Sequence, residues 1–232
     1  MTFQLRETPV AEPLPRSLLR KDHKVSRRIY ADRLKRGIDI FVVSAALILT
    51  APVLIPLMAI ILVLASLDGH SPIYRQRRIG RNGRVYDIYK IRTMVPNAEQ
   101  RLEDYLAANP AARAEWDSHQ KLRHDPRITR FGNFLRKSSL DELPQLVNVL
   151  KGDMSLVGPR PFMECQRALY PGKAYYALRP GITGPWQVSD RNQSTFADRA
   201  LFDAEYYRDV SFGTDLRLLW RTVSVVLRST GL

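Results

Sequence analysis

The chain has 232 residues, of which 45% are hydrophobic, so it is long and apolar enough to bury one substantial core. Its 36 lysines and arginines outnumber its 23 aspartates and glutamates, and the net charge of +13 indicates an anionic partner: nucleic acid, an acidic membrane surface or a phosphorylated substrate. The single cysteine, Cys165, excludes an intramolecular disulfide and suits a reducing compartment, where we expect it to be packed. No histidine or cysteine cluster has the spacing of a zinc site.

The N-terminal part of the chain has two compositions. Residues 1–15 contain three prolines and few apolar residues, which predicts a disordered lead. The basic stretch 16–36 suits an interfacial helix on anionic lipid, although a solvated charged face explains it equally well. We therefore place a disordered, basic extension over residues 1–30.

A long apolar run follows over residues 40–67, without a single charged residue. A helix of this length exceeds the hydrocarbon core of a bilayer, which is about 30 Å thick. Pro52 and Pro56 interrupt the run, and basic residues flank it on both sides, so the positive-inside rule draws both ends to the cytoplasmic face. We expect a re-entrant hairpin that breaks at Pro52 within a membrane region 31–72; a kinked full span is the alternative.

The segment 73–94, "IYRQRRIGRNGRVYDIYKIRTM", predicts a β-hairpin. Apolar and polar residues alternate on either side of an Asn82-Gly83 turn, and the strand period places Lys90 and Arg92 on one face. This hairpin opens a catalytic domain over residues 73–232. With helices predicted for most of the remainder, the fold class is α+β and mainly helical.

Two helical regions follow the hairpin. Residues 97–124 predict a solvated helical insertion that is broken near Asn109-Pro110. Near the C-terminus, apolar residues recur at helical spacing. They are Leu216, Leu219, Trp220, Val223, Val226 and Leu227. Core packing is the first interpretation of this stripe, and an interfacial amphipathic helix is the second, because arginines and a tryptophan accompany it.

Two adjacent acids, Asp141 and Glu142, stand in the stretch "SSLDELPQL". If Ser139 caps a helix, it forms a capping box with Glu142, and the acids lie in the first turn. If the helix starts later, Pro144 suits its first position and the acids lie in the approach. In both registers the acids meet a helix N-terminus, which favours negative charge and therefore also phosphate.

Several arginines stand near this pair in the sequence or in rigid loops. Arg160 lies between two prolines in "VGPRPF", where a fixed backbone could aim its guanidinium at phosphate oxygens. Arg136 precedes the acids, and Arg179 occurs in the Gly- and Pro-rich loop "RPGITGPWQ". We expect such cations and a helix N-terminus to lower the pKa of Asp141 and to keep it ionised.

The motifs "KIRTM", "DPRITRFGNFLRKSSLDELPQLVNVLKGDMSLVGPRP" and "RPGITGPWQVSDRN", preceded by an apolar segment with a central proline, resemble the bacterial sugar transferase family. The likeness covers about residues 30–232. These monotopic phosphoglycosyl transferases move a sugar 1-phosphate from a UDP-sugar to polyprenyl (undecaprenyl) phosphate. The family often carries serine where this chain has Ala51, and glycine is common where it has Asp190. The added carboxylate argues against transferring sugar-site roles to Arg191 or Asn192.

The resemblance implies roles for individual residues. Asp141 would be the nucleophile, and Glu142 would assist it. Asp141 and Glu142 would both be Mg²⁺ ligands. Lys90, Arg136 and Arg160 would bind phosphate. Mg²⁺ suits the pair because it is commonly held by one or two carboxylates together with substrate phosphates.

The resemblance also implies a location and a pathway. The enzyme would work at the cytoplasmic face of the bacterial inner membrane, on anionic phospholipid, in exopolysaccharide or other glycoconjugate assembly. The "PWQVS" wording and the absence of an extra N-terminal membrane bundle indicate a short exopolysaccharide-type member, with glucose or galactose as the sugar and an N-acetylated sugar as the alternative. A non-catalytic membrane adaptor for polysaccharide assembly is a second hypothesis. A nucleic-acid binder is disfavoured, because few aromatic residues accompany the basic patches.

Overall fold

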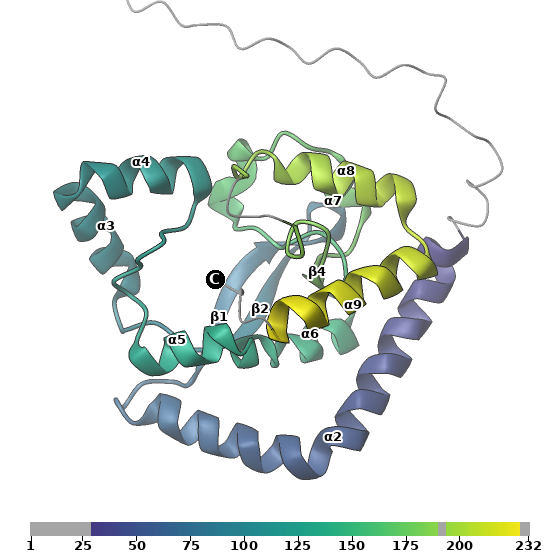
Figure 1. Cartoon of the computed structure of the whole chain (residues 1–232), viewed down its shortest axis with the longest axis horizontal. Helices are drawn as coiled ribbons and strands as arrows, with labels where there is room; N and C mark the ends of the chain where they lie inside the picture. The colour runs from purple at the N-terminus through teal and green to yellow at the C-terminus, as the bar shows by residue number, and fades with distance from the viewer. Residues whose placement is uncertain (1–28, 190–193, 228–232) are drawn as a thin grey trace, which may run out of the picture.

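The computed structural model of the chain describes residues 29–189 and 194–227 (Figure 1). Helices surround two small sheets of two strands each, which confirms a mainly helical fold with a β-hairpin. Almost all of the predicted extension 1–30, most of the basic stretch 16–36 and the loop residues 190–192 lie outside the described residues. Three short helical elements are η2 (Tyr30–Leu34), η5 (Glu164–Leu169) and α7 (Ala174–Ala177).

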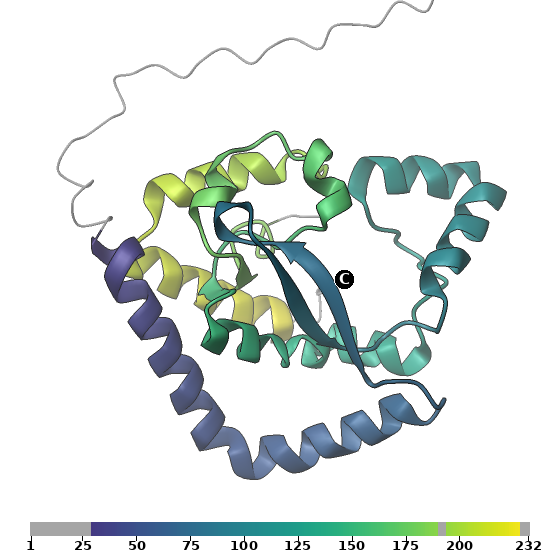
Figure 2. The same cartoon turned by 180° about the vertical axis from the view of Figure 1, so that it is seen from behind.

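The apolar run forms one helix, α2 (Lys35–Ser66), which is long and apolar enough to cross a membrane by length and composition. Pro52 and Pro56 lie inside it, and Figures 1 and 2 show that α2 bends sharply in its middle. In place of the expected break at Pro52, the backbone stays helical through both prolines and the helix bends (Figure 1). Each proline still removes a hydrogen bond and crowds the preceding turn, which bends the helix. The Thr50 hydroxyl donates to the Ala46 carbonyl at 2.7 Å, a contact that also favours bending.

Both halves of α2 pack against the same globular body. Val43, in the first half, belongs to a buried apolar cluster with Tyr86 of the hairpin. Ile61, in the second half, belongs to another such cluster with Leu135. The bend of α2 therefore points away from the body, while its two limbs run back to separate edges of it (Figures 1 and 2).

The predicted β-hairpin is confirmed. Strand β1 (Ile73–Ile79) pairs antiparallel with β2 (Val85–Ile91). The turn η3 (Arg81–Gly83) between them contains Asn82 and Gly83 with φ angles of 59° and 75°. Asparagine and glycine are the residues that enter this left-handed region at the least cost, so the turn follows directly from the sequence.

Hydrogen bonds hold the two ends of α2 to the body. Near its start, Arg36 donates to the Leu150 carbonyl at 2.9 Å. Beyond its end, Asp68 accepts a hydrogen bond of 2.6 Å from Arg92, which directly follows β2. Charged contacts thus reinforce the apolar contacts at both ends of the helix.

The region after the hairpin contains the expected helical insertion. It consists of α3 (Ala98–Ala108) and α4 (Pro110–His119), which form an arm at one edge of the molecule (Figure 1). The break near Asn109 is confirmed: its side chain accepts a hydrogen bond of 3.1 Å from the Ala112 amide and starts α4. Asparagine is a preferred N-cap, and proline fits the first helical position.

The second sheet joins the two rigid loops. Strand β3 (Ser155–Val157) pairs in parallel with β4 (Gly181–Thr183). A Cβ atom on Gly181 would lie 2.1 Å from the Gly158 nitrogen, so only glycine permits this approach. The pairing places the loops "VGPRPF" and "RPGITGPWQ" side by side.

Two helices complete the chain, α8 (Arg199–Asp209) and α9 (Phe212–Leu227). Asp215 of α9 is buried. It accepts hydrogen bonds of 2.5 to 2.7 Å from Tyr30, Lys35 and Tyr206. This carboxylate therefore fixes the start of α2 against both C-terminal helices.

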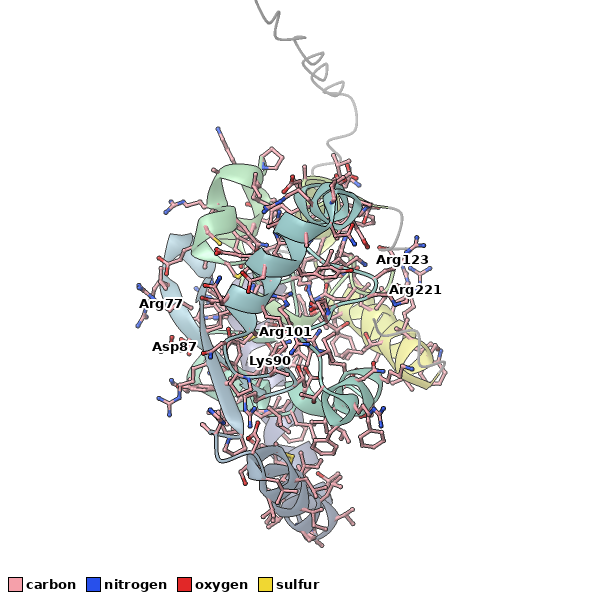
Figure 3. All side chains as sticks on the ribbon, turned by 90° about the vertical axis from the view of Figure 1, so that its left-hand side faces the viewer. Arg77, Asp87, Lys90, Arg101, Arg123 and Arg221 are labelled. Atoms are coloured by element: carbon pink, nitrogen blue, oxygen red, sulfur yellow. The ribbon has the colours of Figure 1, made fainter. Side chains whose placement is uncertain are left out.

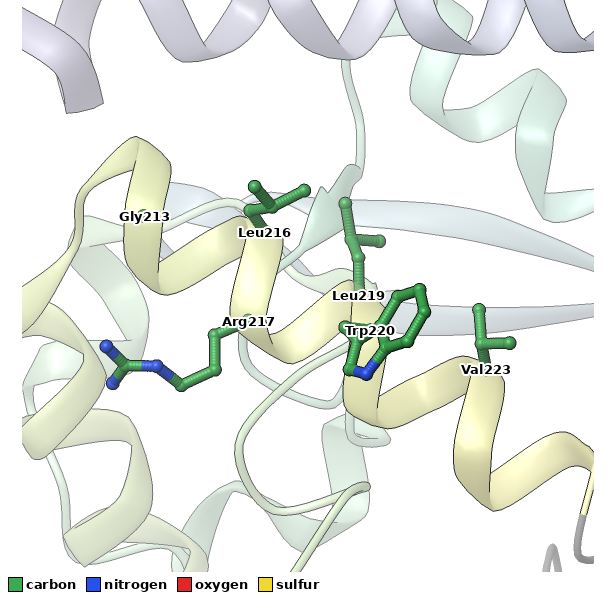
Figure 4. A pocket seen from close by; sticks show the side chains of 6 residues that line it. All are labelled: Gly213, Leu216, Arg217, Leu219, Trp220 and Val223. Atoms are coloured by element: carbon green, nitrogen blue, oxygen red, sulfur yellow. The ribbon is translucent and has the colours of Figure 1, made fainter.

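Leu219 is the described member of the apolar stripe of α9 that packs against the core, so the first interpretation is wrong for Leu216, Trp220 and Val223. Leu218 is the buried apolar residue over 212–225, whereas Leu216, Trp220 and Val223 are exposed, Trp220 by 75%. The anchor at Asp215 rotates the helix so that its neighbour Leu218 faces inward. A shallow apolar depression remains on the exposed side (Figure 4). It is lined by Gly213, Leu216, Arg217, Leu219, Trp220 and Val223.

Candidate active site

The acid pair lies in the approach to a helix and not inside one. Ser139 has a φ angle of +57°, and its side chain caps no helix, so the predicted capping box is wrong. The acids belong to the tight turn η4 (Leu140–Glu142). Pro144 directly precedes α6 (Gln145–Lys151), where its missing N–H costs nothing. The alternative register, with a later helix start, is confirmed.

A lysine from the hairpin reaches both acids. The Nζ atom of Lys90, in β2, lies 2.7 Å from Oε1 of Glu142 and 4.0 Å from Oδ2 of Asp141. Asp141 is only 5% exposed, whereas Lys90 and Glu142 are half-buried. The two carboxylates therefore share one cation in different surroundings.

The surroundings shift the two acids in opposite directions. Burial raises the pKa of Asp141, and the nearby charges of Lys90 and Arg136 do not reverse this. Burial also acts on Glu142, but Lys90 and Arg160 outweigh it and lower the pKa of Glu142 to about 2. The expectation of a lowered pKa for Asp141 is therefore wrong, because the loss of water around this carboxylate exceeds the effect of its cations. Two acids with divergent pKa values suit two different roles.

Arg136 is held beside the pair by the end of the hairpin. It lies in the last turn of α5 (Arg130–Lys137) and donates from Nε to the Thr93 hydroxyl at 2.9 Å. Burial lowers the pKa of Arg136, and the charge of Asp141 opposes this. The guanidinium and the carboxylate are thus close enough to influence each other.

Arg160 is fixed between Pro159 and Pro161, as expected. Its guanidinium carbon lies 5.7 Å from the centroid of the Trp186 ring. Over residues 29–189 and 194–227 it donates no hydrogen bond, yet its charge lowers the pKa of both acids. Together with Lys90 and Arg136, it supplies positive charge around the acid pair, as the sequence predicted.

Arg179 does not join this group. Its Nε atom donates to the Gly152 carbonyl at 3.1 Å. Burial lowers the pKa of Arg179, and the charges of Arg81 and Arg36 lower it further. The structure therefore places Arg179 beside the start of α2, where it supports the loop rather than the acids.

The acid pair can hold a metal only with help from a substrate. No group of three histidine, cysteine, aspartate or glutamate side chains is assembled for a metal ion in the described part of the chain. Asp141 and Glu142 nevertheless offer the one or two carboxylates that Mg²⁺ commonly uses, with substrate phosphates completing its coordination. The donor set thus fits a Mg²⁺ that arrives with a phosphorylated substrate.

Two further arginines near Arg160 were not predicted from the sequence. They are Arg78 in β1 and Arg199 at the start of α8, and the charge of Arg160 lowers the pKa of both. Strand alternation places Arg78 on the opposite face from Arg77, which is the one signal that could have distinguished it. No pattern in the sequence sets Arg199 apart.

Comparison with known proteins agrees with these observations. A family model described as bacterial sugar transferase matches residues 30–229. The "UDP-galactose-lipid carrier transferase" of Erwinia amylovora is 47% identical over 200 residues, which cover 85% of this chain and 41% of that protein. The "Undecaprenyl-phosphate galactose phosphotransferase" of Salmonella typhimurium is 44% identical over 216 residues, which cover 92% of this chain and 44% of that protein.

A shorter relative matches over most of its length. The "Exopolysaccharide production protein ExoY" of Rhizobium meliloti is 43% identical over 199 residues, which cover 85% of this chain and 87% of that protein. The chain therefore spans less than half the length of the Erwinia and Salmonella proteins and most of the length of the Rhizobium protein. The family match and these identities, over a chain whose acid pair lies among the expected cations, show that it belongs to the bacterial sugar transferase family.

Proposed function

We propose that the chain transfers a sugar 1-phosphate from a UDP-sugar to polyprenyl phosphate and releases UMP. The observation that carries this proposal is the acid pair, whose pKa values diverge, lying among Lys90, Arg136 and Arg160. Such an arrangement suits phosphoryl transfer, where positioning and charge neutralisation dominate catalysis. Family membership and the names of the Erwinia and Salmonella relatives support the same reaction.

In the first step, Asp141 attacks the phosphorus that carries the sugar. The P–O bond to UMP breaks, and an acyl phosphate holds the phosphosugar on the carboxylate. The raised pKa of Asp141 makes this carboxylate more basic, and hence a better nucleophile, than an ordinary aspartate. Arg136 and Arg160 neutralise the phosphate oxygens as the charge moves.

In the second step, an oxygen of polyprenyl phosphate attacks the same phosphorus, and the Asp141 carboxylate leaves. Glu142 stays ionised throughout, because its pKa is about 2, and it holds Lys90 in place. Asp141 and Glu142 would hold Mg²⁺ together with the substrate diphosphate. The bound ion would supply further neutralisation of the phosphate charge.

We place the enzyme at the cytoplasmic face of the bacterial inner membrane, with α2 as a re-entrant helix. Both ends of α2 pack on one globular body, which a helix crossing the bilayer completely would not permit. The exposed apolar face of α9, with Arg217 and Arg221 beside it, is suited to anionic phospholipid. The bend of α2 and the face of α9 would then contact the same membrane surface.

Galactose or glucose is the sugar that we propose. Two relatives carry galactose in their names, and the relative of similar length is named for exopolysaccharide production. The corresponding role here is the first membrane step of exopolysaccharide or another glycoconjugate.

The test is a panel of labelled UDP-sugars assayed with Mg²⁺, first without acceptor and then with polyprenyl phosphate. Without acceptor, we expect up to one equivalent of UMP and a phosphosugar bound covalently to the protein. Asp141→Asn should abolish both, whereas Glu142→Gln should slow the reaction by about 10² to 10⁴ and still form some adduct. UMP release that begins only when acceptor is added would favour a one-step transfer. No turnover of any UDP-sugar would favour a non-catalytic adaptor.

A further inference from the structure

A second group of positive charge adjoins Arg160. Arg199 is only 9% exposed, and burial together with the charge of Arg160 lowers its pKa to about 9. Burial and the same neighbouring charge lower the pKa of Arg78 to about 10. Three guanidiniums therefore lie within electrostatic reach of each other in a poorly hydrated part of the protein.

Among the described residues, no carboxylate forms an ion pair with Arg199. Its Nε atom is buried without a hydrogen-bond partner, and its guanidinium donates no hydrogen bond within residues 29–189 and 194–227. The nearby acid is Asp203, which already accepts a hydrogen bond of 2.6 Å from Tyr170. Burial raises the pKa of Asp203 to about 7, so this acid is only partly ionised at neutral pH. Arg199 thus has a weak counterion at best.

Arg78 has polar partners but no acid among the described residues. Its guanidinium donates to Gln76 at 2.5 Å and to the Pro161 carbonyl at 3.4 Å, and its Nε atom is buried without a partner. The groups that raise its pKa are tyrosines. Within residues 29–189 and 194–227, its charge therefore has no carboxylate partner.

Aromatic rings hold these groups in place. The guanidinium carbon of Arg199 lies 4.1 Å from the centroid of the Trp186 ring and 4.5 Å from that of Phe196. Trp186 is itself fixed by a hydrogen bond of 2.9 Å from its indole to Ser194. Arg160 also lies against this ring. Two aromatic rings thus lie against the Arg199 guanidinium, whose N–H groups can bind a planar or tetrahedral anion at its edge.

We propose that Arg78 and Arg199 form, together with Arg160, a subsite for a phosphate monoester beside the acid pair. Burying cations without an anion costs free energy, and a ligand that supplies the anion recovers it. This inference rests on the proposed function for the identity of the ligand. The subsite binds a phosphate group other than the sugar-bearing phosphate that Asp141 attacks.

Two ligands of the proposed reaction carry such a phosphate. In the first step the P–O–P linkage of the UDP-sugar breaks, and UMP leaves as a phosphate monoester. In the second step a phosphate oxygen of the polyprenyl phosphate forms a new P–O bond to the same phosphorus, and the bond to the Asp141 carboxylate breaks. A P–O–P linkage is thus broken in the first step and formed in the second, at the same phosphorus. One subsite can therefore bind the phosphate of UMP and then the phosphate of polyprenyl phosphate.

Binding measured without turnover tests this subsite. The dissociation constants of UMP and of a radiolabelled polyprenyl phosphate are measured on the purified full chain in detergent, for Arg199→Gln and Arg78→Gln. We expect each variant to weaken both ligands about tenfold or more, because each loses charge-assisted hydrogen bonds. Arg77→Gln is the matched control: Arg77 is on the same strand, its side chain is 69% exposed, and Figure 3 shows it at the outer edge.

The outcomes separate the sources of the phosphate. Weakening of one ligand alone assigns the subsite to that phosphate. Unchanged binding of both ligands in folded Arg199→Gln and Arg78→Gln proteins overturns the proposal. If thermal melting shows that Arg199→Gln is unfolded, the binding constants of Arg78→Gln and Arg199→Lys test the proposal instead. Lysine keeps the positive charge but cannot form the two parallel hydrogen bonds of a guanidinium. Absence of UDP-sugar turnover in the unaltered protein would refute the proposed function without affecting these binding results.

Discussion

The Nζ atom of Lys90 lies 2.7 Å from Oε1 of Glu142, although 52 residues separate them in the chain. The hairpin thus supplies the counterion for an acid in the turn before α6. This pairing distinguishes Glu142 from its neighbour Asp141, whose distance to Lys90 is 4.0 Å. It is the contact that allows one acid to stay ionised while the other becomes more basic.

Replacing Lys90 by methionine should therefore change the titration of Glu142. Its pKa of about 2 lies below the ordinary 4.5, so its ionisation stabilises the fold above pH 4.5, and this contribution is lost as the pH falls towards 2. In Lys90→Met the pKa of Glu142 should rise, and the loss of stability on acidification should begin at a higher pH. UMP release should fall by about 10² to 10³.

The measurement for Lys90→Met is the melting temperature between pH 2 and 7, together with UMP release. Asp141 acts in the opposite sense, since its raised pKa favours the folded protein at low pH, so the comparison is made against the unaltered protein. Lys151→Met, at a side chain that is 52% exposed, should change neither the pH dependence of the melting temperature nor UMP release. Identical pH profiles for Lys90→Met and the unaltered protein would remove Lys90 as the counterion.

Arg160→Lys should lose more activity than a swap that conserves charge would suggest. Lysine offers a point charge where the guanidinium, fixed between two prolines, offers a fork to phosphate oxygens. We expect kcat/KM to fall about 10- to 100-fold, as for the loss of a charge-assisted hydrogen bond. Arg84→Lys, at an exposed position of the hairpin turn, should leave it unchanged. Near-normal turnover of Arg160→Lys would reduce Arg160 to a turn residue.

Both flanks of α2 should lie on the cytoplasmic side. Because Cys165 is exposed, and not packed as expected, single cysteines are placed in a Cys165→Ser protein, at Ile29 and at Ser71. Neither should react with a membrane-impermeant thiol reagent that is added outside intact cells. Labelling of one position alone would mean that α2 crosses the bilayer.

Pro52→Ala tests the topology of α2 in a second way. The substitution restores a backbone hydrogen bond at the bend and should favour a straighter helix. We expect part of the protein then to label at one flank. If the labelling pattern does not change, Pro56 or the basic flanks suffice to keep both ends together.

Trp220 should lie at lipid level, because it is 75% exposed on the apolar face of α9 (Figure 4). In vesicles with bromine-labelled acyl chains, lipid should quench part of the tryptophan fluorescence. The quenched part should disappear in Trp220→Phe and remain in Trp116→Phe, whose indole stacks with Arg127 of the body instead. Equal quenching in both variants would mean that this face is not against the membrane.

Asp215→Ala should destabilise the protein by about 3 to 5 kcal/mol, because it leaves the buried Lys35 ammonium with only the more distant Asp39 carboxylate, 4.0 Å away, and removes the carboxylate that accepts from Tyr30 and Tyr206. Thermal unfolding in detergent measures the loss. Asp209→Ala, which removes a carboxylate that is 42% exposed, should cost less than about 1 kcal/mol. If Asp215→Ala loses no more stability than Asp209→Ala, the Asp215 carboxylate does not hold α2 to the C-terminal helices.

Local patterns in the sequence predicted the elements well. The Asn82-Gly83 turn, the apolar run with its two prolines and the helix start at Asn109 all depend on neighbouring residues, whose steric preferences act before any tertiary contact forms. The long motifs identified the family, and the predicted positions of Lys90 and the arginines around the acids followed from it.

Only the tertiary structure decided the properties that depend on burial. Ser139 turned into the left-handed region and capped nothing, and the pKa of Asp141 rose although cations surround it. The same holds for α9, whose exposed face followed from the anchoring of Asp215 and not from its periodicity.

The assembly of the charged groups also depended on the fold. From the sequence, Arg179 resembled Arg160 as a loop arginine, whereas Arg78 and Arg199 were not singled out. The fold placed Arg179 beside the start of α2 and brought Arg78 and Arg199 near Arg160. Local sequence determines backbone preferences, but the energy of a charge depends on the water and the opposite charges around it, and distant segments supply or remove both.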